Sequence, residues 1–347
     1  MFFGRIYMKK LQKEFEEFND FIKIGSETIA LREKREKLKK DMEDYFPDEC
    51  SDYGISINKS DLRFIHQGSY KIGTTISNQG KSIDLDYAVI FPLDITEHTD
   101  PREVKKAAKA ALEIKNIRIP TIKEPCVTVA YHSNGVETMH IDFPLYAEYN
   151  SQLYLARGKA TSANPQWEIA DPEGLNDYFL DEFKEKEQLK RVVRYIKKWK
   201  QEKYKNASSS HEVPPSVGLT ILACQNYAEY TYGGDDDMLS MYYTMKGIRD
   251  RFVVTTDRDG MVTDASIVCN LPVQPYSNVF YKMTSSHMKT FYTRLNTAVE
   301  NLREAVNLSE AHEAAKYVRK VLGEDFTLPP KEADNVSTKN KGEYSFG

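Results

Sequence analysis

The chain has 347 residues, of which 40% are hydrophobic and 29% are charged, and its formal net charge is −4. This length allows one large domain or two of ordinary size, and the composition is that of a globular protein with a well-solvated surface. A protein dedicated to duplex nucleic acid usually carries an overall basic footprint. The charge balance argues against a protein dedicated to duplex nucleic acid, although it allows a local basic groove.

The cysteines and the lack of long apolar segments indicate the cellular compartment in which the protein works. Four cysteines lie far apart, with no Cys-x-x-Cys pair and no cluster with histidine, which argues against a structural zinc site and a disulfide framework. The first ten residues are interrupted by Arg5, Lys9 and Lys10, unlike a signal peptide, and no window approaches twenty apolar residues. We expect a cytoplasmic protein in a reducing compartment, without membrane contact.

The first third of the chain mixes helices with strands. Residues 6–46 have apolar residues at helical spacing and then charges of alternating sign, which predicts a long helix that could bend or break at Gly25. Strands are predicted over 61–65 and 82–91. Residues 101–118 are rich in alanine and start at a proline, a pattern that favours a helix.

A hairpin follows this helix. The runs 126–131 and 136–143 are β-prone and are joined by a turn that contains Asn134-Gly135, the strongest short-range signal for a hairpin. Apolar residues in 150–170 show little helical or strand periodicity, so we predict that this segment is rich in loops.

From Asp171 onward the pattern is mainly helical. One amphipathic helix includes residues 189–199, and another begins after the proline pair before Ser216. Two further helices are predicted near 284–306 and 309–322. The predicted fold is therefore α+β, with a mixed sheet and its helices in the first half and a helical second half.

Two aspartates interrupt an otherwise apolar strand. Asp84 and Asp86 flank Leu85 in IDLDYAVIF. Burying an unpaired carboxylate costs several kcal/mol, so these two negative charges need a compensating positive charge, for which a divalent metal ion is the first candidate. Residues i and i+2 of a strand point to the same face, roughly 7 Å apart. Asp142, on the second strand of the hairpin, is also set among apolar neighbours. If the hairpin pairs beside residues 83–91, three carboxylates converge.

Three carboxylates without protein nitrogen or sulfur ligands suit a hard cation, chiefly Mg²⁺ or Mn²⁺. Two such ions could activate an attacking hydroxyl and stabilise a leaving pyrophosphate. Upstream, Gly68 would let the backbone approach a phosphate closely, and Ser69 could hold phosphate oxygens. A Gly-Ser pair or an Asp-x-Asp strand alone is a weak signal, but their order before a later acidic strand is a strong one.

This order resembles the polymerase-β-type nucleotidyltransferases. Within them, the sequence is similar to the cGAS/DncV-like nucleotidyltransferases (CD-NTases) of bacterial anti-phage (CBASS) signalling. The similarity runs from about residue 60 to residue 225 and includes QGSY, IDLDYAV, HIDFPLYA, WEIADPEGLNDYF, RYIKKW and PPSVGLTIL.

The resemblance implies an organisation and an activity. It implies a spine helix with a catalytic lobe over residues 1–160, a helical lobe over 161–328 and a flexible tail over 329–347. It implies that NTPs, with ATP and GTP expected, are joined and then closed into a cyclic di- or trinucleotide with release of pyrophosphate. The product would act on a downstream effector.

The resemblance also implies roles for single residues. Asp84, Asp86 and Asp142 match its metal-binding triad, and Asp142 would help to deprotonate the acceptor hydroxyl. The contacts to the donor phosphates would come from Gln67, Gly68, Ser69, Lys197 and Ser216. Without the resemblance, Lys197 would read as an exposed helix lysine and Ser216 as a plain helix cap.

Two positions depart from the cyclic GMP-AMP branch of the family. Ile72 stands where that branch has an aromatic ring for base stacking, and Ala170 stands where it has a serine that helps to recognise a guanine. The base identity of the product is therefore open, and Tyr70 or another tyrosine could supply a stacking ring.

The partners expected from the sequence are few. No zinc-ligand cluster and no basic surface are visible, so activation by duplex nucleic acid is not expected. The polar tail ends in Gly347, which suits conjugation by an E1/E2-like partner, as in some systems of this family. An inert tail is the alternative.

Two other functions remain open from the sequence. One is a linear nucleotidyltransferase that acts on RNA, protein or a small-molecule acceptor such as an antibiotic, since it would share the triad. The other is a catalytically dead nucleotide-binding or toxin-partner module, against which the intact triad argues.

Overall fold

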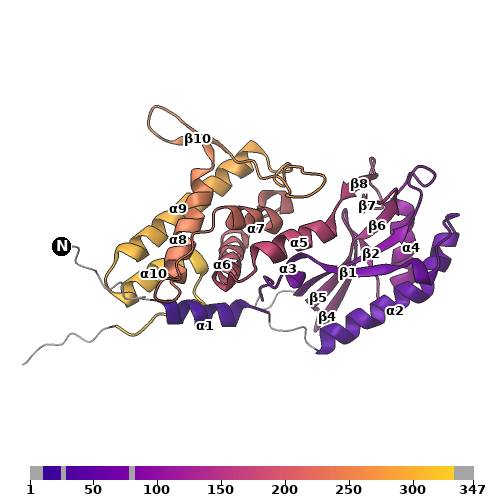
Figure 1. Cartoon of the computed structure of the whole chain (residues 1–347), viewed down its shortest axis with the longest axis horizontal. Coiled ribbons are helices and arrows are strands. Elements are labelled where there is room, and N and C mark those ends of the chain that lie inside the picture. Colours follow the sequence, from indigo (N-terminus) through magenta and orange to yellow (C-terminus); the bar gives the residue numbers. More distant parts are fainter. Residues whose placement is uncertain (1–10, 25–28, 78–82, 332–347) are drawn as a thin grey trace, which may run out of the picture.

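The computed structural model describes residues 11–24, 29–77 and 83–331. They form two lobes, one built on a sheet and the other on helices (Figure 1). The N-terminal segment contains two helices, α1 (Gln12–Ile22) and α2 (Ile29–Ser51). Lys23 has an extended backbone and ends α1, so the predicted long helix is interrupted close to Gly25, where the sequence allowed a break. Residues 6–10 and Gly25 lie outside the described residues.

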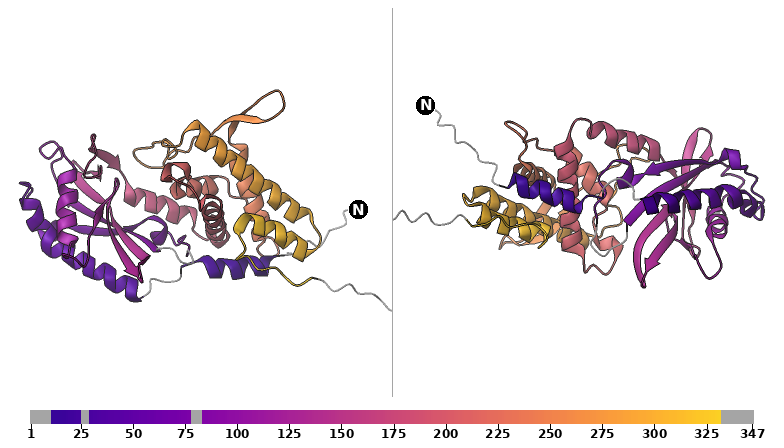
Figure 2. Two further views of the ribbon diagram at one scale, coloured as in Figure 1. Left: turned by 180° about the vertical axis from the view of Figure 1, so that it is seen from behind. Right: turned by 90° about the horizontal axis from the view of Figure 1, so that it is seen from below.

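The two N-terminal helices serve different cores. The buried face of α1 joins the core of the helical lobe through Phe15 and Phe18, whereas α2 joins the core of the sheet lobe through Leu38 and Phe46. Figures 1 and 2 show α1 beneath the helical lobe and α2 along the sheet lobe. The segment therefore braces both lobes, because each part carries its own apolar stripe.

The sheet lobe has a mixed sheet with the order β3-β4-β5-β2-β6-β7-β8, and β1 pairs with β2 outside this path. β2 runs parallel to β5 and β6, and the other neighbours are antiparallel. The strands are β1 (Arg63–Gln67), β2 (Ile83–Pro92), β3 (Thr121–Ile122), β4 (Val127–Ser133), β5 (Val136–Phe143), β6 (Leu145–Tyr149), β7 (Gln152–Arg157) and β8 (Gln166–Ala170). The predicted strands and hairpin are confirmed.

Residues 150–170 differ from the predicted loop, since β7 and β8 lie there and pair with each other. These strands are mostly half-buried, so their sequence lacks a strong apolar pattern and their pairing decides the structure. The sheet ends at Ala170, and the domain boundary near residue 160 stays a prediction. Helix α4 (Arg102–Leu112) is shorter than predicted, and Asn116 with φ +63° lies in the turn that follows.

The helical lobe follows the sheet, and the structure confirms the α+β class. Its elements are α5 (Pro172–Glu182), α6 (Glu187–Tyr204), α7 (Ser216–Gln225), α8 (Asp237–Asp250), the hairpin β9 (Val253–Thr256) with β10 (Val262–Ser266), α9 (Ser285–Asn307) and α10 (Ala311–Leu322). The sequence pattern does not predict α8 or the β9–β10 hairpin. All four cysteines are buried and free. In the described ranges, we find no helix long and apolar enough to cross a membrane.

Candidate active site

The parallel pairing of β2 with β5 brings the acidic residues together. Its register sets Asp84 opposite His140 and Asp86 opposite Asp142. Because alternate residues share a face, these four side chains lie on one patch of the sheet. The expectation that the hairpin pairs beside the Asp-x-Asp strand is therefore confirmed.

The compact ligand group on this patch includes a histidine. Asp84, His140 and Asp142 each offer a ligand atom, and these atoms lie within 4.8 Å of one another. The Nε2 of His140 lies 3.1 Å from Asp84 Oδ1, and its Nδ1 lies 2.8 Å from an oxygen of Glu137. Asp86 is outside this compact group. His140 is not among the site residues predicted from the sequence, although its place two residues before Asp142 puts it on the same face of the strand.

The charges on the patch prepare it for a cation. Burial, together with the charges of Asp84 and Asp142, raises the pKa of Asp86 to about 8. The hydrogen bond to Asp84 raises the pKa of His140 to about 9. Asp142 accepts a 2.5 Å hydrogen bond from Thr128 Oγ1, and Lys123 Nζ lies 3.5 Å from it. Crowded carboxylates of this kind fit a divalent cation, and oxygen ligands favour Mg²⁺ or Mn²⁺.

The Gly-Ser pair forms a tight turn on this patch. Helix α3 (Gly68–Lys71) starts at Gly68, whose φ is +69°. A Cβ at Gly68 would collide with the carboxylate of Asp86, so only glycine allows the turn to sit there. Ser69 Oγ lies 3.1 Å from Thr75 Oγ1, and Gln67 Oε1 accepts a 3.2 Å hydrogen bond from the Tyr146 hydroxyl.

Two lysines of α6, the buried Lys197 and the half-buried Lys200, approach from the helical lobe. Lys197 is 5% exposed, and its Nζ donates to Thr74 Oγ1 at 2.8 Å and to the Thr74 carbonyl at 3.2 Å. Lys200, one turn later, donates to Ser216 Oγ. Burial, Lys200 and Arg194 lower the pKa of Lys197 to about 7, and burial lowers that of Lys200 to about 8. Within the described ranges, neither ammonium has an ion pair with a carboxylate.

Lys200 is not among the site residues predicted from the sequence. Its place three residues after Lys197 puts both on one helix face, which is the signal that could have found it.

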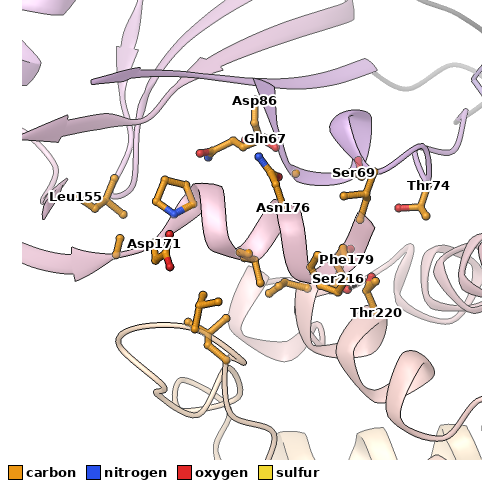
Figure 3. A pocket seen from close by; sticks show the side chains of 18 of the residues that line it. Gln67, Ser69, Thr74, Asp86, Leu155, Asp171, Asn176, Phe179, Ser216 and Thr220 are labelled. Carbon is orange, nitrogen blue, oxygen red and sulfur yellow. Dashed lines mark hydrogen bonds between the residues drawn. The ribbon is translucent and has the colours of Figure 1, made fainter. Parts of the chain in front are cut away.

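These groups line one cavity of about 590 Å³ between the lobes. Every predicted site residue except Asp142 lines it, and Asp142 lies next to Asp86 on the neighbouring strand. Figure 3 shows Ser69 and Ser216 toward one end, Leu155 and Asp171 toward the other, and Asp86 with Gln67 between them. The arrangement provides a cation patch and an ammonium-lined end in one space.

The two departures from the family pattern also lie at this cavity. Ile72 and Ala170 both line it, and Ile72 is buried in the core of the helical lobe. Tyr70 instead packs against His66, with ring centroids 5.3 Å apart. Tyr146 is the tyrosine among the described lining residues.

Comparisons with known proteins find similarity in sequence and in fold. Residues 62–146 match the family "Cyclic GMP-AMP synthase DncV-like, nucleotidyltransferase domain". A curated relative, the cyclic GMP-AMP synthase of Escherichia albertii, is 28% identical over 186 residues, which cover 50% of this chain and 39% of that protein. The match thus spans well under half of the relative's length.

Solved structures extend the similarity to the whole fold. The Vibrio cholerae DncV cyclic AMP-GMP synthase with the linear intermediate pppA(3′,5′)pG has a TM-score of 0.67 and 17% identity, and the match covers 92% of this chain and 96% of that one. Its apo form has a TM-score of 0.68 and 16% identity, with 92% and 95% covered. Residues 62–146 are therefore similar to the DncV-like nucleotidyltransferase domain, in a chain that has the fold of the Vibrio cholerae enzyme.

Proposed function

We propose that the chain is a metal-dependent nucleotidyltransferase that joins NTPs into a cyclic di- or trinucleotide and releases pyrophosphate. The observation that carries the proposal is the cavity itself. It is lined by the two aspartates of β2, which lie beside Asp142 of β5, and by Lys197 and Lys200, neither of which has an ion pair with a carboxylate among the described residues. A buried cation without a counter-charge is costly, so this end is suited to a polyanion such as a triphosphate. Relatives named for cyclic dinucleotide synthesis support this function.

Each residue then has a task. Asp84, Asp86 and Asp142 would hold Mg²⁺ or Mn²⁺, with His140 bonded to Asp84. The ion would acidify the attacking hydroxyl and offset the charge of the leaving pyrophosphate. Lys197, Lys200 and the hydroxyls of Ser69 and Ser216 would hold the triphosphate, and the backbone at Gly68 would approach it.

The bond changes balance in each joining step. The hydroxyl oxygen of the acceptor ribose bonds to the α-phosphorus of the donor, and the bond from that phosphorus to the pyrophosphate oxygen breaks. The hydroxyl proton passes to a carboxylate, for which we propose Asp142. The free hydroxyl of the joined nucleotides repeats the step on the remaining triphosphate and closes the ring. We further propose that this product is a messenger in anti-phage signalling, with ATP and GTP as substrates.

Product analysis tests the function. The purified chain is incubated with all four radiolabelled NTPs and Mg²⁺ or Mn²⁺, treated with phosphatase, and its products are identified by mass spectrometry. We expect a phosphatase-resistant cyclic product that is absent from the Asp84→Ala/Asp86→Ala variant. A product that grows only on RNA, protein or an added small molecule would instead indicate a linear transferase.

The thermal stability of Asp86→Asn separates loss of chemistry from loss of fold. Burial disfavours the Asp86 carboxylate in the absence of a cation, so the variant should be at least as stable as the wild type in EDTA. It should also lose the stabilisation that Mg²⁺ and nucleotide give the wild type. Cyclic product from Asp86→Asn at the wild-type rate would contradict the proposed role.

A further inference from the structure

The end of the cavity remote from the lysines is built by β7 and β8. Leu155 and Glu168 are cross-strand partners, and Arg157 follows Leu155 by two residues, so the three share one face of the sheet. All three line the cavity, and Figure 3 shows Leu155 at the end opposite Ser69. Residues 271 and 273–275 of the helical lobe also line the cavity. The cavity therefore has walls from both lobes.

Arg157 is fixed by groups from both lobes. Its Nη1 lies 2.8 Å from Glu168 Oε2, its Nη2 lies 2.7 Å from Glu124 Oε1, and the same Nη2 donates to the Tyr281 hydroxyl at 3.3 Å. Glu124 is also bonded to Lys282 at 2.9 Å. The guanidinium therefore has a set orientation, and it in turn sets the carboxylate of Glu168.

The two glutamates of this cluster are not equivalent. Glu124 is held by two cations, whose hydrogen bonds lower its pKa to about 2, and it lies outside the cavity lining. Glu168 lines the cavity and pairs with Arg157. A carboxylate has about four acceptor positions and the ion pair uses one, so Glu168 can accept further hydrogen bonds from a group in the cavity.

We infer that Glu168, positioned by Arg157, selects a guanine base at this end of the cavity. The inference rests on the proposed function, because it places a nucleotide with its triphosphate at Lys197 and Lys200. Guanine offers adjacent N–H donors at its N1 and its 2-amino group, which a carboxylate can accept together. Adenine presents its 6-amino donor beside the ring acceptors N1 and N7, and uracil flanks its one ring N–H with two carbonyls. A fixed carboxylate therefore favours guanine over both.

The Glu168→Gln variant tests this selection because glutamine keeps the length and replaces the charge by an amide. Product composition is measured in equal ATP and GTP, and equilibrium binding is measured with non-hydrolysable ATP and GTP. We expect the GTP-to-ATP preference to fall about tenfold or more, as for loss of one good bidentate base contact. An unchanged preference in a folded Glu168→Gln variant would overturn the inference.

Two further variants separate selection from general disturbance. Glu124→Gln makes the same chemical change in the same ion cluster but outside the cavity, and because Glu124 acts only through Arg157, it should lower the base preference much less than Glu168→Gln does. Glu168→Asp keeps the carboxylate and should keep the sign of the preference. If Glu124→Gln alters the preference as much as Glu168→Gln does, the inference fails.

The equilibrium binding measurements distinguish failure of this inference from failure of the proposed function. A wild-type chain that forms no cyclic product yet prefers GTP through Glu168 would contradict the function and support the inference. A chain that forms cyclic product while Glu168→Gln leaves the base ratio unchanged would do the reverse.

Discussion

Lys197 is buried and Lys200 is half-buried, and neither forms an ion pair with a carboxylate in the described part of the chain. Their depressed pKa values, about 7 and about 8, follow first from burial. The ordinary lysine value is 10.5, so the unfolded chain binds more protons than the folded chain between about pH 7 and 10.5. This pair therefore makes the nucleotide-free protein gain stability as the pH rises through that window, and it costs stability below it.

Replacing either lysine should separate stability from binding. We expect Lys197→Met or Lys200→Met to raise the free energy of unfolding of the nucleotide-free protein at pH 7 by about 1–3 kcal/mol, with little effect near pH 10. Each variant should bind a nucleoside triphosphate about tenfold more weakly or worse, because a charge-assisted contact is lost. Denaturant unfolding and titration calorimetry measure the two effects.

A matched control lies between these residues. Lys198 is bonded to Glu202 at 2.9 Å and to Asp325 at 3.1 Å, and it is not part of the cavity lining. Lys198→Met should lose some stability and keep nucleotide affinity. In the wild type at pH 8, triphosphate binding should take up protons, seen as a heat that depends on the buffer. Absence of proton uptake would argue against a lysine-held triphosphate.

At the scale of elements, the turn into α3 determines how closely the backbone meets the aspartates. Gly68 and Gly73 both have φ +69°, so a side chain at either position is strained by about 1 kcal/mol or more. They differ in surroundings. A Cβ at Gly73 would have nothing within 4 Å, whereas a Cβ at Gly68 would collide with Asp86.

Alanine substitutions at Gly68 and Gly73 can therefore be compared as a test and its control. Gly73→Ala should lose roughly 1 kcal/mol of stability and keep its nucleotidyltransferase activity. Gly68→Ala should lose more stability and, because Asp86 must move, most of its activity. Urea unfolding and product formation measure the two quantities. Equal activity in both variants would show that the close approach at Gly68 is not needed.

At the scale of the molecule, the two lobes have separate cores and meet through polar contacts. These include Lys197 to Thr74 at 2.8 Å, Lys282 to Glu124 at 2.9 Å and Arg63 to Glu173 at 2.6 Å. The cavity lies at this junction, so a nucleotide would contact both lobes and link them.

Hydrogen exchange should reveal this linkage. With Mg²⁺ and a non-hydrolysable triphosphate at about 100 times Kd, stability should rise by about 2.7 kcal/mol. Exchange should slow both in β1–α3 and at the start of α7, because the triphosphate spans them. The corresponding nucleoside should not protect α7. Protection confined to the sheet lobe would contradict the placement of Lys197, Lys200 and Ser216 on the triphosphate.

The sequence alone determined the local elements that carry the aspartates. Alternation on the strand fixes Asp84 and Asp86 to one face, and the Asn134-Gly135 turn fixes the hairpin that carries Asp142. These signals are local, since strand period and turn chemistry depend on neighbours in the chain. The sheet and the helical second half were predictable for the same reason.

Only the tertiary structure decided which distant groups share the cavity. Helix α1 ends before Lys23, and the apolar faces of α1 and α2 then pack in two different cores. Strands β7 and β8 are stabilised by pairing with neighbouring strands, because their own sequences lack a strong apolar pattern. The hydrogen bond from Lys200 to Ser216 depends on how α6 packs against α7, and the contact of Arg157 with Tyr281 depends on how the lobes pack. The physical reason is that the periodic pattern of side chains along a helix or strand is set by neighbours in the sequence. The partners and the burial of a residue are instead set by contacts between segments far apart in the chain.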